Sequence, residues 1–113
     1  MQSAALSDFS RLCIHTITTK PWALDEAVRN YSAAGVKGIT VWRQALEGHD
    51  VAASGKMIRE AGLSIASLCR GGFFSSTTAD GRAKAIDENR RCIDQAAQLG
   101  APLIVLVCGA VPG

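Results

Sequence analysis

The fold is decided by the stretch AAGVKGITVW at residues 33–42, because the same arrangement occurs twice more along the chain. The similar stretches are EAGLSIASLC at 60–69 and QLGAPLIVLV at 98–107. In each, a helix-compatible segment leads to a glycine, a short spacer and an apolar run rich in strand-forming residues. Glycine accommodates the left-handed backbone just past a helix C-terminus, so each of these glycines is expected to end a helix.

Strands are predicted where the apolar runs follow these glycines, at 38–43, 64–70 and 103–108, and at an earlier run, 12–17. The segments between them carry the period of amphipathic helices. The expected inward-facing residues are Leu24, Ala27, Val28, Tyr31 and Ala34 in the first helix, Val51, Met57 and Ile58 in the second, and Ile86, Ile93, Ala96 and Ala97 in the third. Asp50 and Asp80 are the expected N-terminal caps of the second and third helices.

The resulting order, βαβαβαβ, predicts an α/β fold with parallel strands covered by helices. Two architectures fit this order: an open doubly wound sheet, or an arc of a (β/α)8 TIM barrel. No GxGxxG or Walker motif follows the first strand, which removes the main nucleotide-binding indication of the open sheets.

Composition excludes several classes of function. The chain has 113 residues and a formal net charge of +2, without a Lys/Arg tract, so no nucleic-acid partner is expected. No apolar run approaches the ~20 residues that span a bilayer, and the first residues lack the pattern of a signal peptide. The four cysteines show no CxxC spacing. We therefore expect a cytoplasmic protein without disulfides and without membrane association.

Three longer strings carry a family resemblance. They are GVKGITVWRQAL at 35–46, REAGLSIASLCRGGFF at 59–74 and ENRRCIDQAAQLGAPLIVLVCG at 88–109. All three resemble the xylose isomerase-like TIM-barrel superfamily, in its sugar phosphate isomerase/epimerase branch. The resemblance begins near Arg11. It implies a tail at 1–10 and, at 11–113, the amino-terminal half of a barrel: three βα units and the fourth strand.

The resemblance also implies a chemistry. Relatives of this kind isomerise or epimerise a small sugar or sugar phosphate with a divalent metal (Mg, Mn, Zn or Co), held by Glu, Asp and His on later strands. The strands predicted here contain no carboxylate. We therefore expect no metal ligand in this chain, and in the complete protein metal-assisted turnover would depend on residues outside it.

In barrels the active face lies at the carboxyl ends of the strands. His15 ends the first strand and is the candidate acid–base residue; the alternative is an imidazole satisfied by the backbone. The candidate substrate contacts at the other strand ends are Trp42, Arg43, Arg70, Gly71 and Cys108.

Each of these candidates also has a structural interpretation. Trp42 could offer a flat wall to a sugar or simply pack under a helix. Arg43 and Arg70 could anchor an anionic substrate bidentately, or form salt bridges with loop acids such as Glu47. The segment EGHD at 47–50 could hold a metal weakly, but Asp50 is better explained as a helix cap.

Three functions stay open on the sequence alone. The first is a sugar isomerase/epimerase-like half-barrel whose other half supplies the metal. The second is a non-catalytic module that binds a small ligand after two copies pair their exposed sheet edges into a homodimer with a closed barrel. The third is a fragment without a function of its own, which should expose its apolar edges and aggregate.

Overall fold

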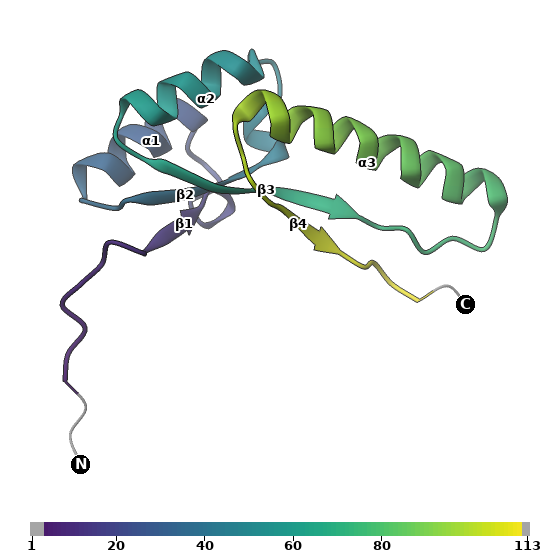
Figure 1. Ribbon diagram of the computed structural model, residues 1–113, viewed down its shortest axis with the longest axis horizontal. Coiled ribbons are helices and arrows are strands. Elements are labelled where there is room, and N and C mark those ends of the chain that lie inside the picture. The colour runs from purple at the N-terminus through teal and green to yellow at the C-terminus, as the bar shows by residue number, and fades with distance from the viewer. Residues whose placement is uncertain (1–3, 112–113) are drawn as a thin grey trace.

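A computed structural model of the protein describes residues 4–111 (Figure 1). The strands are β1 (Cys13–His15), β2 (Gly38–Trp42), β3 (Ser64–Gly72) and β4 (Ile104–Val107). The α-helices are α1 (Leu24–Ala33), α2 (Val51–Glu60) and α3 (Ala79–Leu99). Short 3-10 helices follow the first two strands: η1 (Thr16–Thr19) and η2 (Arg43–Leu46). The predicted alternation of strands and helices is confirmed.

All four strands are parallel, and their order in the sheet, β1-β2-β3-β4, is their order along the chain. Figure 1 shows α1, α2 and α3 on the same side of this sheet. A doubly wound sheet places helices on both faces and reverses its strand order at a switch point. The protein is therefore an α/β fold of the barrel type, and its four strands correspond to half of a (β/α)8 barrel.

The core lies between the sheet and its helices. The residues that are fully buried there include Ile39, Val41 and Leu68 from the strands and Ile58 and Leu99 from the helices. The predicted stripe of α1 is confirmed at Leu24, Ala27, Val28 and Tyr31, whereas Ala34 is exposed because it lies just past the end of the helix. The glycines at 35, 62 and 100 all have positive φ, as predicted for helix ends.

Helix α2 is anchored by a predicted cap and an unpredicted close contact. The Asp50 carboxylate accepts a hydrogen bond from the Ala53 amide at 2.9 Å, which confirms the expected cap. Ile58 is fully buried, while Val51 and Met57 only border the core. Gly55 faces the end of α3, where an added Cβ would lie 2.2 Å from the Leu99 carbonyl oxygen. Gly55, which lowers the helix propensity of α2, thus allows α2 and α3 to touch.

The predicted inward face of α3 is confirmed only at Ala96. Cys92, Ala96 and Leu99 are buried, whereas Ile86 is 46% exposed and Ile93 58% exposed. Ala97 is exposed as well. The face of α3 that packs against the sheet carries the smaller residues. It lies about a quarter of a turn around the helix from the face that carries the isoleucines. The cap is also not Asp80: the Thr78 hydroxyl accepts from the Gly81 amide at 3.0 Å.

Strand lengths differ from the predicted ranges for local reasons. The chain turns into η1 at Thr16 and into η2 at Arg43, so the first two strands end earlier than expected. β3 instead continues to Gly72, and it contains two bulges, at which Ala66 and Arg70 have no counterpart in the neighbouring strand. β4 is two residues shorter than predicted.

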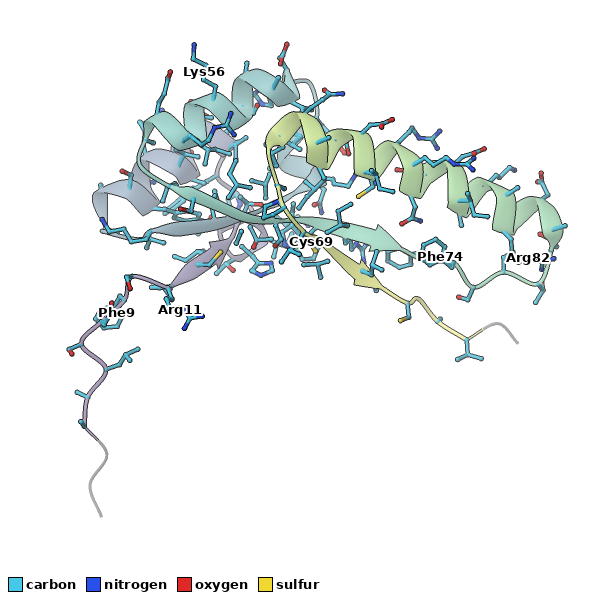
Figure 2. The ribbon with its side chains drawn as sticks, in the orientation of Figure 1. Phe9, Arg11, Lys56, Cys69, Phe74 and Arg82 are labelled. Atoms are coloured by element: carbon cyan, nitrogen blue, oxygen red, sulfur yellow. The ribbon has the colours of Figure 1, made fainter. Side chains whose placement is uncertain are left out.

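Both outer strands of the sheet are exposed. Leu12 beside β1 is 46% exposed, and Leu103 and Leu106 on the β4 side are 65% and 58% exposed. Residues 4–10 form no helix or strand and are exposed, and Figure 2 shows this segment, with Phe9 labelled, extending away from the sheet. Residues 1–3 and 112–113 of the two predicted ranges lie outside the described residues. Among residues 4–111, no helix has the length and apolar character needed to cross a membrane.

Candidate functional site

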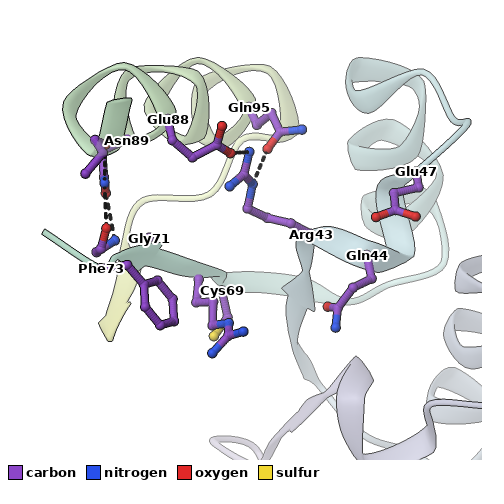
Figure 3. A pocket seen from close by; sticks show the side chains of 12 residues that line it. Arg43, Gln44, Glu47, Cys69, Gly71, Phe73, Glu88, Asn89 and Gln95 are labelled. Carbon is purple, nitrogen blue, oxygen red and sulfur yellow. Dashed lines mark hydrogen bonds and ion pairs between the residues drawn. The ribbon is translucent and has the colours of Figure 1, made fainter. Parts of the chain in front are cut away.

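The candidate site lies at the carboxyl ends of β2 and β3. A cavity of about 470 Å³ opens there beneath α3 (Figure 3). Its walls come from the ends of both strands and from the inward face of α3, and include Arg43, Arg70, Phe73, Glu88 and Asn89. A second hollow of about 270 Å³ adjoins it through the shared residues Gln44 and Glu47.

His15 and Trp42 are joined directly. The Trp42 indole Nε1–H donates a hydrogen bond to His15 Nδ1 at 3.0 Å. Parallel pairing of β1 with β2 brings the two side chains together, because His15 lies opposite Thr40 and Trp42 follows two residues later on the same face. Since Nδ1 accepts, the proton of the neutral imidazole resides on Nε2. His15 therefore offers one N–H donor away from the tryptophan.

This pair lies on the face of the sheet away from the helices. Ile39 and Val41 point into the helix-covered core, so Thr40 and Trp42 point to the other side. There the Thr40 hydroxyl contacts the Ser67 hydroxyl at 2.8 Å and Cys13 Sγ at 3.5 Å. This face is thus lined by polar groups of three adjacent strands. In a barrel it would face the lumen.

Arg70 lies over the same tryptophan. Its guanidinium carbon is 5.8 Å from the Trp42 ring centroid and 4.5 Å from that of Phe73. Arg70 is the extra residue of the second bulge in β3, between Cys69, which pairs with Val105, and Gly71. A bulge re-aims the side chain that it carries, which is why bulges are common at barrel rims and next to active sites.

Phe73 reaches Arg70 through an unusual backbone. It is the one non-glycine residue among the described residues with a positive φ, 56°. Its amide donates to the Val107 carbonyl oxygen at 2.7 Å, which fixes the loop after β3 against the end of β4. Such conformations cost of order 1–3 kcal/mol and tend to occur at functional sites.

Arg43 is directed elsewhere. Its Nη2 lies 2.7 Å from Glu88 Oε1, and its Nε donates to the Gln95 side chain, so the guanidinium binds the inward face of α3 (Figure 3). Arg91 contacts the other Glu88 oxygen at 2.7 Å. Hydrogen bonds from Arg91 and then Arg43 hold the pKa of Glu88 below its usual value. The structural interpretation of Arg43, an ion pair with an acidic residue, is thus confirmed, although the partner is Glu88 on α3 and not Glu47.

Asn89 organises the end of β3, although it was not among the candidate site residues. Its side chain accepts from the Gly72 amide at 2.7 Å and donates to the Gly72 carbonyl oxygen at 2.8 Å (Figure 3). Gly71 passes close beneath it, since an added Cβ would lie 2.9 Å from Asn89 Oδ1. The adjacent glycines in SLCRGGFF were the available indication that another group approaches this backbone.

The remaining strand-end candidates lie apart from this cluster. Gly71 lines the cavity, but the Asn89 side chain lies close against it. Cys108 is exposed just beyond β4. Cys69, in contrast, is buried, and so is Cys92 on α3. Burial raises the pKa of both thiols, which keeps them protonated and poorly nucleophilic.

Comparison with known proteins fits this geometry. A model of the family described as "Xylose isomerase-like TIM barrel" matches residues 28–113. The chain belongs to this family. No curated protein matches it.

Solved structures share the family's fold. A protein from Sinorhizobium meliloti 1021 is 42% identical with a TM-score of 0.82, over 90% of this chain and 38% of that one. A xylose isomerase domain-containing protein from Salmonella typhimurium LT2 is 13% identical with a TM-score of 0.80, over 96% and 42%. A xylose isomerase-like TIM barrel/4-hydroxyphenylpyruvate dioxygenase fusion protein is 22% identical with a TM-score of 0.74, over 83% and 15%. The chain thus spans well under half of each.

The residues of this xylose isomerase-like chain do not fit a metal ion. Within residues 4–111, no three His, Cys, Asp or Glu side chains gather as a ligand set would. In the EGHD segment, the Asp50 carboxylate is used as a helix cap. The Glu88 carboxylate is held by two arginines. The described part of the chain therefore offers no ligand set for a divalent cation.

Proposed function

We propose that the chain supplies the substrate-binding wall of a barrel enzyme that isomerises or epimerises a small sugar or sugar phosphate. The observation that carries this proposal is the contact of His15, Trp42 and Arg70 at the carboxyl ends of β1 to β3. Barrel enzymes place their substrate at this end. Family membership supports the class of reaction, and the span of less than half of each relative leaves room for the remaining catalytic groups.

Each residue has a role in this proposal. The Trp42 ring offers an apolar surface to the carbon face of a sugar. The His15 Nε2–H, oriented by the indole, donates to a substrate hydroxyl or carbonyl oxygen, and the ring can exchange a proton with that oxygen during enolisation. The Arg70 guanidinium binds substrate oxygens from the side of Trp42 opposite to His15. The base that removes a carbon-bound proton would come from outside this chain.

A chimera tests the proposal. Residues 11–111 would be joined to the part of the S. meliloti protein that has no counterpart here, and aldoses and ketoses would be followed by NMR in D2O with added divalent cations. Interconversion is expected, and deuterium next to the carbonyl would indicate proton transfer rather than a hydride shift. His15→Gln should abolish turnover, whereas Arg29→Gln, on the exposed side of α1, should not. A cooperatively folded chimera without any interconversion would contradict the proposal.

A second function has its own observation in the open edges of the sheet. Ile86 and Ile93 lie about 200° around α3 from Glu88 and Gln95, which face β2, so the isoleucines point away from β2. Leu103 and Leu106, on the β4 side of the sheet, are exposed as well. A second copy, related by a two-fold along the barrel axis, could pair its β1 with this β4 in parallel.

Solution mass decides whether this second function applies. A homodimer that closes the barrel and binds a sugar without converting it would have twice the chain mass and a melting temperature that rises with protein concentration. Ligand would raise the melting temperature further while leaving the ligand chemically unchanged. A folded monomer at all concentrations would exclude self-completion of the barrel.

A further inference from the structure

We infer that Arg70 is an anchor for an oxyanion, so that the ligand of this site is a small molecule carrying a carboxylate or phosphate rather than a neutral sugar. This inference rests on the proposed function and narrows its substrate class. Three features of the strand ends support it: an arginine without an acidic partner, a cradle that fixes its guanidinium, and a second donor beside the same tryptophan.

The two strand-end arginines differ in what they bind. Arg43 forms an ion pair with Glu88 and donates a hydrogen bond to Gln95. Within residues 4–111, no carboxylate lies within 4 Å of the Arg70 guanidinium, although Glu47 borders the same cavity. Arg70 therefore carries an uncompensated positive charge at the mouth of the cavity, and an arginine fork matches the geometry of carboxylate and phosphate.

The guanidinium is held in place before any ligand arrives. The faces of Trp42 and Phe73 both contact it, at 5.8 Å and 4.5 Å from their ring centroids. Aromatic faces attract the cation without using its N–H groups, which stay available at the edge of the plane. Phe73 occupies a left-handed backbone conformation to take this position, and the bulge aims Arg70 toward it. Less side-chain freedom is then lost on binding.

A second donor belongs to the same cluster. Trp42 contacts Arg70 with its ring and donates its indole N–H to His15, so His15 Nε2–H and the guanidinium border one indole. A neutral sugar stacking on Trp42 would have to share the ring with Arg70, and it would gain only neutral hydrogen bonds from these donors. An oxyanion instead gains charge-assisted hydrogen bonds from both donors, which are about twice as strong as neutral ones.

The chain contains a built-in reporter for this binding. It has two tryptophans, so a ¹⁵N-labelled sample gives two indole signals. That of Trp42 reports the site, and that of Trp22, which packs on Tyr31, serves as the internal control. The probes are glycerol, glycerate and glycerol phosphate, which share a three-carbon skeleton and differ in the anionic group.

Saturable shifts of the Trp42 signal are expected with glycerate and glycerol phosphate but not with glycerol, and added salt should weaken them. A tighter fit of either anion identifies carboxylate or phosphate as the natural group. Arg70→Gln should weaken binding about tenfold or more, and Arg70→Lys less, because it keeps the charge but loses the fork. Arg29→Gln removes the same charge from the exposed side of α1 and should bind the two anions as the parent chain does.

The inference is overturned if glycerol shifts the signal as the anions do, if neither anion gives a saturable shift, or if Arg70→Gln binds like Arg29→Gln. If Arg70→Gln does not fold, the Arg70→Lys comparison and the Arg70 Nε–H signal of the parent chain decide the matter. The proposed reaction would be refuted by a different result from the one that refutes the anchor. A chimera that converts only neutral sugars would retain the reaction and refute the anchor, whereas anion binding without turnover would do the reverse.

Discussion

The two faces of the β2–β3 sheet are built on different principles. Toward the helices, Ile39, Val41 and Leu68 are fully buried in the hydrophobic core. On the other face, Thr40 and Ser67 exchange a hydrogen bond, and Trp42 connects a histidine with an arginine. The first face is stabilised by burial, which tolerates many sequences, whereas the second depends on individual partners. Changes to the two faces should therefore differ in size and in kind.

The largest effect is expected from Ile58→Ala, because Ile58 is fully buried between α2 and the sheet. Removing it should lower the free energy of unfolding by about 2–5 kcal/mol in a urea titration. The matched control is Ile93→Ala on α3, which is 58% exposed and should change stability by about 0.5 kcal/mol or less. A large loss from Ile93→Ala that grows on dilution would instead mean that a second copy covers this face.

Gly55→Ala gives the next largest effect, and its sign separates local from tertiary reasoning. Helix propensity alone favours alanine at this position by about 1 kcal/mol. Because the new Cβ would lie 2.2 Å from the Leu99 carbonyl oxygen, we expect a loss of about 1–3 kcal/mol. Ala52→Gly on the exposed side of α2 is the control and should lose about 1 kcal/mol through propensity. Stabilisation by Gly55→Ala would refute the close approach of α2 and α3.

Sequence reasoning predicted the helix-covered face well because burial leaves a periodic pattern. The stripe of Leu24, Val28 and Tyr31 and the helix-ending glycines could be identified residue by residue. It failed on α3, which has two apolar stripes. The larger residues, Ile86 and Ile93, were assigned to the core, but the sheet is covered by the smaller stripe, whose contacts with β3 cannot be derived from periodicity.

The other face was predicted only in its list of residues. His15, Trp42 and Arg70 were candidates because they end strands, yet the sequence could not tell that Trp42 bonds His15. That contact depends on the register of β1 against β2. The divergence of Arg43 and Arg70 depends on a bulge and on Gln95, which lies 52 residues beyond Arg43. Partners so distant in sequence carry no local pattern.

Asn89→Ala tests whether the end of β3 depends on a single partner. The variant loses both hydrogen bonds to Gly72 and leaves a partly buried peptide group unpaired, so a loss of about 1–3 kcal/mol is expected. Asn30→Ala on the exposed side of α1 is the matched control and should be nearly neutral. The Trp42 indole signal adds a readout of position, since displacement of Gly72 should move Phe73 and Arg70. Equal stabilities of the two variants would show that Asn89 does not hold the strand.

The smallest effect concerns the ion pairs that keep Arg43 away from the open face. Arg91 and Arg43 lower the pKa of Glu88 from 4.5, so in the native protein this carboxylate binds fewer protons than in the unfolded chain near that pH. Its stabilisation is therefore present above about pH 4.5 and is lost as the pH falls through the lowered native pKa. Because Glu88 is half exposed, solvent screening limits it to about 0.5 kcal/mol. The parent chain and Glu88→Gln should thus differ slightly in urea midpoint at neutral pH and converge in acid. A difference that stays constant across this range would mean that the charge of Glu88 contributes nothing, and that Gln95 alone directs Arg43 to α3.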